Sequence, residues 1–181
     1  MNVEYIRNLS RLGIEVWKDI PDFEGLYQVS NLGNVRIVNY RKTGKYKIKK
    51  KCLNSSGRYN LGLSKNKIYY GGKKISVLVA MAFLNHKSCG YKLVVDHIDN
   101  NPRNDKLYNL QVITHRENCS KDKKGTSKHT GVYWHKLSKK WKSQIRVNGK
   151  RKALGLFKNE IEAANAYKKA LKEYEEKTII L

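Results

Sequence analysis

The sequence predicts an α+β fold with three parts: a small antiparallel β module, a ββα core, and a C-terminal three-stranded antiparallel sheet packed on one helix. Three observations lead to this prediction. Short β-type runs alternate with glycine-containing turns before residue 75, a pattern typical of antiparallel strands. Two apolar runs then enclose a turn-rich loop and lead into a helix start. Finally, Asn148-Gly149 is the strongest short hairpin signal in the chain, and a helical pattern follows it.

The charge of the chain is strongly positive. Lys and Arg total 38 against 15 Asp and Glu, which gives a formal net charge of +23. No acidic residue occurs between Gly25 and Val95 or between Lys123 and Asn159. So broad an imbalance indicates a polyanionic partner, and nucleic acid is the obvious one. A basic protein that binds membranes would instead carry an amphipathic basic helix.

Cysteine usage and apolar runs bear on the cellular compartment. The three cysteines contain no C-x-x-C pair, so neither a zinc site nor a disulfide framework is indicated. The longest apolar run, Val77 to Leu84, is too short to span a bilayer, and no secretory leader opens the chain. We therefore expect a protein of the reducing cytoplasm with no membrane partner.

The first part, residues 14–74, is predicted to be a β-rich, DNA-contacting module. Alternation in residues 26–30 and 35–38, on either side of Asn31-Leu32-Gly33-Asn34, indicates a hairpin. In the strands that follow, lysines alternate with apolar residues, so one face can pack while the other meets phosphate. The exposed cations expected to contact DNA in this module are Arg36, Arg41 and Lys42.

The central part, residues 75–122, begins with an apolar helix. A β-type run then places Asp96 and His97 side by side at a strand end. A loop of turn-forming residues follows, and a second apolar run, residues 110–113, brings the chain back. A capping box at Thr114 predicts the start of a short helix.

A carboxylate, an imidazole and an amide can converge in this part, since Asn118 sits one turn into the capped helix. Asp96 and Asn118 offer hard oxygen ligands of the kind a magnesium-like ion accepts. His97 suits a general base that takes a proton from water. A lone Asp-His pair in a loop is usually surface decoration, but the surrounding strands and capped helix favour a site. His115, on the same helical face as Asn118, could contact phosphate or the ion, or could only cap the helix or face solvent.

Residues from about 75 to 122 resemble the HNH nuclease core of phage-type homing endonucleases, through Asp96-His97, Asn109 and Asn118. The resemblance implies a ββα-metal fold in which Asp96 and Asn118 hold one divalent ion, Mg²⁺ or Mn²⁺. It also implies that His97 is the general base and that Asn109 pins the loop that aims it.

The segment before this core carries a second resemblance and one departure. Residues 15–36 resemble the N-terminal module found in many phage HNH homing endonucleases, which implies an antiparallel β unit that leans on DNA beside the nuclease core. The departure is Ser76, at a position of the preceding helix where the family often carries a histidine. The metal ligands implied by the resemblance are unaffected.

The C-terminal part, residues 130–177, follows a polar, glycine-containing linker at residues 123–129. Three strands and a helix are predicted for it, and together they would make a compact DNA reader. The strands and the helix cap are expected at residues 130–135, 140–147, 150–156 and Asn159.

Residues from Thr130 to about Tyr174 resemble the APETALA-type (ethylene-response-factor) DNA-binding domain. The resemblance rests on Gly131-Val132, Gln144-Ile145-Arg146, Leu154-Gly155-Leu156-Phe157 and Ala163-Ala164-Asn165-Ala166-Tyr167. It implies a sheet laid in the major groove with the helix packed behind it. Two of its arginines fall on DNA-contacting positions of that family, and two further residues stand where the plant domains have arginine. The candidate DNA contacts of this part are Arg146, Arg151, Lys142, Tyr133 and His135.

Together these features predict a metal-dependent, site-specific DNA endonuclease of the HNH homing type, associated with a mobile element. Its partner would be double-stranded DNA, in the cytoplasm of a bacterial or phage-infected host cell. A monomer with one active site favours a nick in one strand, and a dimer stays open. The main alternative is a non-catalytic DNA-binding transcriptional regulator, and a more distant one is an RNA-binding protein.

Overall fold

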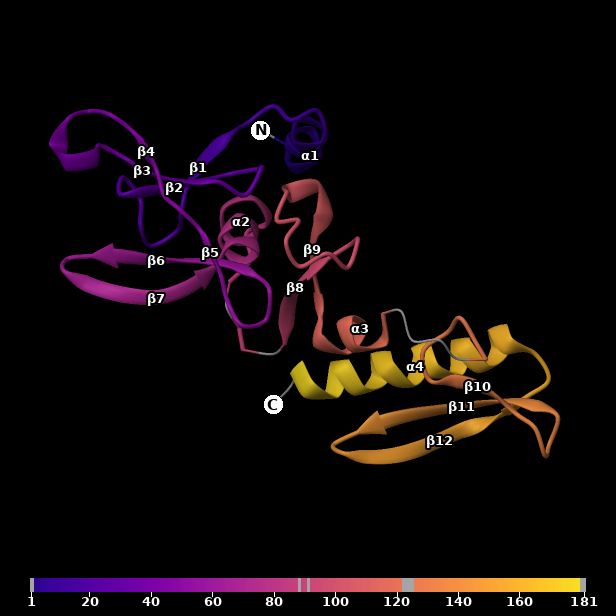
Figure 1. The fold of residues 1–181 in the computed structure, drawn as a ribbon. Coiled ribbons are helices and arrows are strands. Elements are labelled where there is room, and N and C mark those ends of the chain that lie inside the picture. Colours follow the sequence, from indigo (N-terminus) through magenta and orange to yellow (C-terminus); the bar gives the residue numbers. More distant parts are fainter. Residues whose placement is uncertain (1, 88, 91, 122–125, 180–181) are drawn as a thin grey trace. The chain divides into compact units, whose positions relative to one another are not determined.

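The computed structural model describes residues 2–87, 89–90, 92–121 and 126–179 (Figure 1). The chain forms two compact units, residues 1–119 and 120–181. Among the described residues, the first unit contains three small antiparallel sheets with several helices and the second contains one antiparallel sheet with one helix, so the predicted α+β class is confirmed. Of the predicted linker 123–129, residues 123–125 lie outside the described residues, as does Asp122 at the end of the predicted central part.

The first unit opens with helix α1 (Val3–Arg11), which leads into a four-stranded antiparallel sheet. The predicted hairpin forms, with a turn at residues 31–34. The Ser30 hydroxyl holds this turn by accepting hydrogen bonds from the backbone N–H groups of Leu32 and Asn34. In sheet order the strands are β1 (Trp17–Asp19), β2 (Tyr27–Ser30), β3 (Val35–Ile37) and β4 (Lys47–Ile48), with the 3-10 turn η1 (Tyr40–Lys42) between the last two.

A second, three-stranded antiparallel sheet follows in the order β5 (Cys52–Leu53), β6 (Tyr59–Lys65) and β7 (Ile68–Lys74). The pairing of β6 with β7 shifts between Gly62 and Leu63. A Cβ on Gly62 would overlap the ring of Tyr69, so the absence of a side chain there lets this ring lie across the neighbouring strand.

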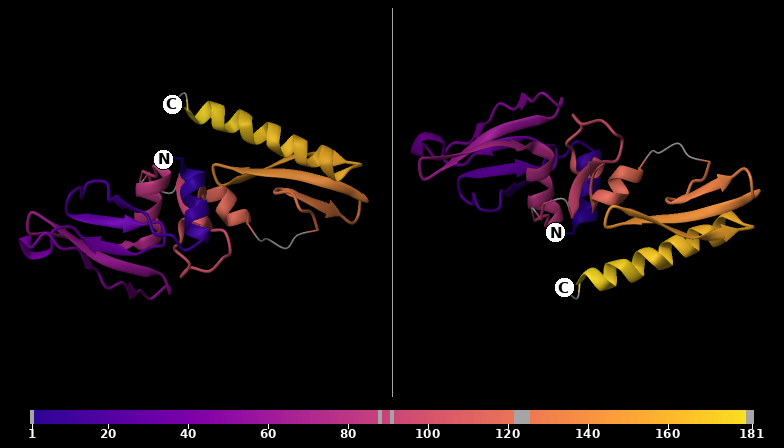
Figure 2. Two further views of the ribbon diagram at one scale, coloured as in Figure 1. Left: turned by 90° about the horizontal axis from the view of Figure 1, so that it is seen from above. Right: turned by 90° about the horizontal axis from the view of Figure 1, so that it is seen from below.

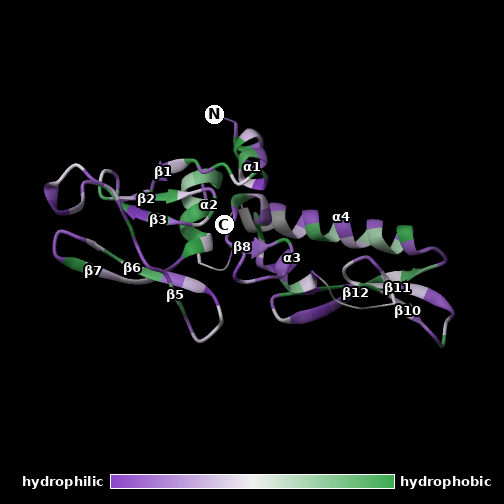
Figure 3. Ribbon diagram, turned by 45° about the horizontal axis from the view of Figure 1, so that its top comes forward, coloured by the Kyte–Doolittle hydropathy of each residue, from purple (hydrophilic) through white to green (hydrophobic). Residues whose placement is uncertain are grey.

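The ββα segment lies in the same unit. Helix α2 is hydrophobic nearly all round (Figure 3), because it packs against both sheets and against the β8–β9 ribbon. The elements of this segment are α2 (Ile75–Leu84), β8 (Leu93–His97), η2 (Leu107–Asn109), β9 (Leu110–Thr114) and α3 (His115–Ser120). Strands β8 and β9 pair antiparallel, with His97 opposite Leu110.

One hydrophobic core joins the predicted β module to the predicted central part. It contains fully buried side chains from α1, both sheets, α2 and the segment before β9. Full burial of each large aliphatic side chain stabilises the fold by roughly 1.5–3 kcal/mol. Helix α1, which precedes the expected module start at residue 14, also contributes to this core. Representative members are Ile6, Val29, Leu63, Leu78 and Leu107.

The second unit is a three-stranded antiparallel sheet with helix α4 along one face (Figure 2). Its small core contains Val132, Ala163 and Ala164. The hairpin turn is Asn148-Gly149, and both residues have a positive φ. None of the described helices combines the length and apolar character needed to cross a membrane. The elements are β10 (Val132–His135), β11 (Lys140–Val147), β12 (Lys150–Phe157) and α4 (Glu160–Ile179).

Gly131 permits the close packing of the second unit. Its φ is +76°, and a Cβ there would overlap the Tyr167 ring and the backbone oxygen of Gln144. We expect Gly131→Ala to lower the free energy of unfolding of this unit by about 2–5 kcal/mol, because backbone strain adds to overpacking. Hydrogen exchange of the β10–β12 amides measures this quantity.

Gly149→Ala is the matched control. Gly149 has nearly the same φ, +77°, but a Cβ there would meet nothing within 4 Å. It should therefore cost only the backbone term, about 1–2 kcal/mol. Equal losses in the two variants would contradict the packing role assigned to Gly131.

Candidate active site

The β8–β9 ribbon places the predicted Asp96 and His97 at its end, where both side chains are buried. Asp96 lies opposite Gln111, whose side-chain amide donates a 2.8 Å hydrogen bond to the Asp96 carboxylate. The chain turns immediately after His97, since the backbone oxygen of His97 accepts a hydrogen bond from the N–H of Asn100. The two neighbouring residues thus occupy the rim of one short ribbon.

The imidazole of His97 is held from both sides. Its Nε2 lies 3.0 Å from Oδ1 of Asp105, and its Nδ1 lies 3.2 Å from Nη1 of Arg58. A guanidinium can only donate, so Nδ1 must be the acceptor in this contact. The ring hydrogen is then on Nε2 and is donated to Asp105. This arrangement fixes the tautomer and the orientation of the ring, as expected for a histidine that uses Nδ1 as a base.

Asp105 is buried as deeply as His97, with only 3% of its side chain exposed. The turn of the β2–β3 hairpin supports its position. The backbone oxygen of Asn31 accepts a 2.8 Å hydrogen bond from the N–H of Leu107. Gly33 approaches so closely that an added Cβ would lie 3.1 Å from the Cβ of Asp105. The N-terminal sheet therefore helps to set the geometry of His97.

Asn109 is buried and fastens both ends of the loop after β8. Its side-chain oxygen accepts from the N–H of Asp99, and its side-chain nitrogen donates to the carboxylate of Asp99 and to the backbone oxygen of Asn104. Its backbone oxygen accepts from the N–H of Ile98, the residue after His97. Asn109 thus lies in the position from which it could pin the loop.

The Asp99 carboxylate is the centre of this loop. Burial by itself raises the pKa of Asp99, but hydrogen bonds from Asn104, Asn101 and Asn109 outweigh that effect and hold the pKa below its ordinary value. The stability that Asp99 contributes is therefore present above the ordinary pKa of 3.8, and it is lost as the pH falls through the lowered value.

Asn118 lies on α3 and lines a cavity of about 350 Å³ beside β8. Arg58 and His86 line the same cavity, and so does Ser76, the residue at the position where a family histidine was expected. His115 is exposed on α3, and its Nδ1 lies 3.4 Å from the sulfur of Cys119.

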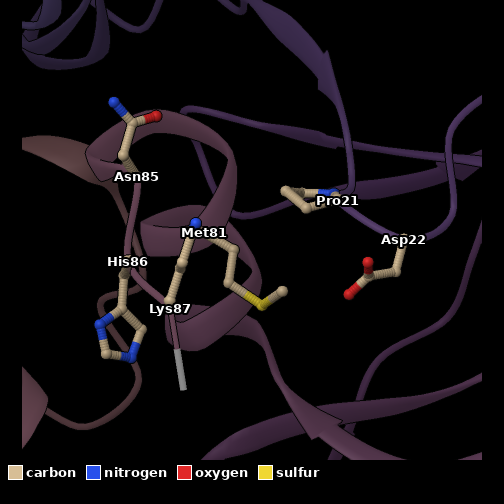
Figure 4. Close-up of a pocket in the computed structure, with 6 residues that line it drawn as sticks. All are labelled: Pro21, Asp22, Met81, Asn85, His86 and Lys87. Carbon is tan, nitrogen blue, oxygen red and sulfur yellow. The ribbon is translucent and has the colours of Figure 1, made fainter. Parts of the chain in front are cut away.

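A larger cavity of about 510 Å³ contains none of the predicted site residues. Its walls include Asp22, from the connection between β1 and β2, and His86, from the segment after α2 (Figure 4). Methionine and proline side chains make much of the remaining wall.

The oxygen donors of Asp96 and Asn118 fit a magnesium-like ion in their chemistry. Such an ion is commonly held by one or two protein groups, with water and substrate phosphate as the other ligands. The hydrogen bond from Gln111 to Asp96 is of the kind that orients ligating carboxylates. Among the described residues no group of three His, Cys, Asp or Glu side chains could hold a metal. A site built from these residues would therefore rely on substrate to complete it.

Arg36 is placed differently from the exposed cation expected. Its guanidinium lies between the rings of Trp17 and Tyr46, at 4.3 and 3.9 Å from their centroids. Its Nε and Nη2 both donate to the side-chain oxygen of Gln28. The expectation that Arg36 is exposed was wrong: the residue is half-buried, because two aromatic rings and an amide hold its side chain on the sheet. Arg41 and Lys42, in η1, are exposed.

The candidate DNA contacts of the second unit lie on β10, β11 and β12. Tyr133 pairs with Lys142 and Arg146 pairs with Arg151, and directly opposed residues share a sheet face. The Nε of Arg146 donates to the backbone oxygen of Gly149. His135 faces its own turn, where Nδ1 lies 2.8 Å from the Ser138 hydroxyl.

Arg58 and Asp105 were not identified from the sequence as site residues. Asp105 lies eight residues after His97 in a loop with several Asn and Asp residues. The composition of this loop gives no reason to choose Asp105 over the others. Arg58 is 39 residues from His97 and stands in a tract of many basic residues. Only the tertiary packing brings the three side chains together.

Comparison with known proteins identifies two segments. Residues 15–64 match the family model for the NUMOD4 motif, and residues 90–119 match a family model for HNH endonucleases. Both matches lie in the first unit. The APETALA-type resemblance of residues 130–174 stays a prediction.

Individual relatives include DNA endonuclease I-HmuI of Bacillus phage SP01, which is 39% identical over 104 residues, 56% of this chain and 54% of that protein. The uncharacterized HNH endonuclease L247 of Acanthamoeba polyphaga mimivirus is 36% identical over 61% of this chain and 26% of its own length. Protein 3.8 of Escherichia phage T7 is 37% identical over 31% of this chain and 49% of its own length.

A solved structure of I-HmuI, described as showing DNA binding and cleavage by an HNH homing endonuclease, aligns with a TM-score of 0.48 and 36% identity. It covers 57% of this chain and 55% of that chain. This chain spans about half the length of I-HmuI. The matches show that this chain carries a NUMOD4 motif followed by an HNH endonuclease motif.

Proposed function

We propose that this protein is a metal-dependent DNA endonuclease of the homing type that hydrolyses a phosphodiester bond in duplex DNA. The observation that carries the proposal is the buried Asp105–His97 pair, which leaves Nδ1 of His97 as the acceptor nitrogen within the HNH segment. A histidine oriented by a carboxylate is the arrangement used to activate a nucleophile. The net charge of +23 supports duplex DNA as the partner.

In the proposed reaction, Nδ1 of His97 takes a proton from a water molecule whose oxygen attacks phosphorus. The bond between phosphorus and the 3′ oxygen breaks, and the leaving 3′ oxygen takes a proton from a solvent water molecule, which gives 5′-phosphate and 3′-hydroxyl ends. Asp105 accepts the Nε2 hydrogen bond throughout and stabilises the positive charge that the ring acquires. Asn109 keeps the loop after His97 in place through its bonds to Asp99 and Asn104.

Asp96 and Asn118 would hold one Mg²⁺ or Mn²⁺ ion, and Gln111 would orient the Asp96 carboxylate. When bound, such an ion supplies electrostatic stabilisation of the phosphate and of the leaving oxygen. Each chain has one proposed general base, His97, and therefore one active site, so we propose that a monomer nicks one strand. The exposed basic residues of both units would contact phosphates, in the cytoplasm of a bacterial or phage-infected cell.

The first test is His97→Ala, measured on a supercoiled plasmid whose insert the wild-type chain cleaves with Mg²⁺ or Mn²⁺. Loss of the general base should slow nicking by about 100-fold or more. His129→Ala, an exposed histidine of the second unit, serves as the control. Wild-type speed in His97→Ala would remove the proposed base. A wild-type chain that binds DNA but never cuts it would favour the regulator alternative.

Asp105→Asn tests whether Asp105 acts by positioning His97. The amide keeps the shape of the carboxylate and its oxygen can still accept, but it cannot stabilise the charged ring. We expect the cleavage rate at saturating DNA to fall by about tenfold or more, with DNA affinity unchanged. A parallel loss of affinity and of thermal stability, with an unchanged rate per bound complex, would indicate a merely structural residue.

Gln111→Ala tests the proposed ion site without touching a ligand. Removal of its 2.8 Å hydrogen bond to Asp96 should weaken the affinity for Mn²⁺ by about 10–100-fold. Calorimetric titration of Mn²⁺ into the chain bound to a non-cleavable DNA duplex measures this affinity, and Asp96→Ala should abolish the same binding heat. Unchanged binding in Asp96→Ala would place the ion elsewhere.

A further inference from the structure

Arg58 is held firmly at its backbone and reaches far from its own strand. It directly precedes β6, where the side-chain oxygen of Asn54 accepts hydrogen bonds from the backbone N–H groups of Ser56 and Arg58. The backbone oxygen of Arg58 accepts from the N–H of Asn54 in the same turn. From this anchor the half-buried side chain extends to Nδ1 of His97.

The guanidinium of Arg58 has no carboxylate partner within ion-pair distance in the part of the chain that the structure describes. The neighbouring sequence offers no such partner either, since residues 25–95 contain no acidic residue. A neutral imidazole is a weak partner for a half-buried positive charge, because it brings no compensating negative charge. Arg58 is therefore set to exchange His97 for an anion.

The cavity of about 350 Å³ beside β8 supplies room for that anion. Arg58 and Lys74 bring positive charge to it, Ser76 a hydroxyl and Asn118 an amide, and none of the described residues that line it has a carboxylate side chain. His86 also lines it, and its buried Nδ1 has no hydrogen-bond partner in the described structure. Such a set of donors suits a phosphodiester, with Arg58 able to make the bidentate contacts that phosphate favours.

We propose that this cavity is the subsite for a DNA phosphodiester, and that Arg58 leaves Nδ1 of His97 to bind that phosphate. In the free chain the acceptor nitrogen is covered by Arg58 and cannot take a proton from water. When DNA binds, the guanidinium of Arg58 moves from Nδ1 of His97 to the phosphate. This one movement uncovers the base and brings a positive charge next to the phosphate. This inference rests on the proposed function and adds the group that couples substrate binding to the base.

The exchange can be followed without catalysis, by ¹⁵N NMR of the His97 ring in the absence of divalent ions. Adding a short DNA duplex to the wild-type chain should move the Nδ1 signal of His97. In Arg58→Ala the signal should already be displaced in the free chain, and the duplex should change it little. Lys73→Ala is the control, because Lys73 is an exposed lysine that does not line the cavity, and this variant should give the wild-type signals with and without the duplex.

Cleavage gives the second measurement. Arg58→Ala should slow cleavage at saturating DNA by about 10–100-fold, since a donor to the phosphate is lost. Arg58→Lys should recover part of this rate, and it keeps the test usable if the alanine variant folds poorly. A plasmid nicked equally fast by Arg58→Ala and by the wild-type chain would overturn the inference.

The two proposals can fail separately. If duplex DNA does not move the Nδ1 signal of His97 in a wild-type chain that still nicks plasmid, the proposed role of Arg58 is wrong but the proposed function stands. A chain whose signal responds through Arg58 but that never cleaves DNA supports the phosphate subsite and contradicts the proposed function.

Discussion

The hydrogen bond between His97 and Asp105 is supported by the packing of two distant parts of the chain against each other. Both side chains are buried, and the turn at Asn31 and Gly33 lies against the loop that carries Asp105. Asn31 is itself fixed, since its side chain accepts from the N–H of Val16 and donates to the backbone oxygen of Ile14. The orientation of one imidazole thus depends on a tightly hydrogen-bonded turn more than sixty residues earlier in the chain.

Much of the fold followed from local patterns. Alternating residues and turn-forming residues located the β2–β3 hairpin, the β8–β9 ribbon and the Asn148-Gly149 turn, because period-two patterning and turn chemistry act over a few residues. Asp96, His97 and Asn118 were singled out from a strand end and a capped helix in the same way, and their roles stay predictions. Arg58 and Asp105 were not, because their importance comes from contacts made only after the unit has folded.

The exposure of Arg36 was predicted wrongly, whereas Arg41 and Lys42 are exposed as expected. Arg36 stands in an alternating strand like its neighbours, yet two aromatic rings and Gln28 enclose its guanidinium. The burial of Arg36 is decided by side chains outside its own strand, namely Gln28 on β2, Trp17 on β1 and Tyr46 before β4. The residue pattern of β3 alone carries no information about these partners. In the second unit, the pairing register shows which of the basic residues share a face, with Arg146 opposite Arg151.

The shared core of the first unit bears on how such chains can be rearranged. The NUMOD4 and HNH motifs match two separate family models, at residues 15–64 and 90–119. Each motif could therefore be taken for a unit that can be exchanged between proteins independently of the other. Yet Leu63 and Leu107 are buried in one core, and the glycine turn at Gly33 touches Asp105. In a chimaera joined near residue 75, His97 would lose its native Arg58 contact and the turn that holds Asp105, so we expect a functional exchange to transfer both motifs together.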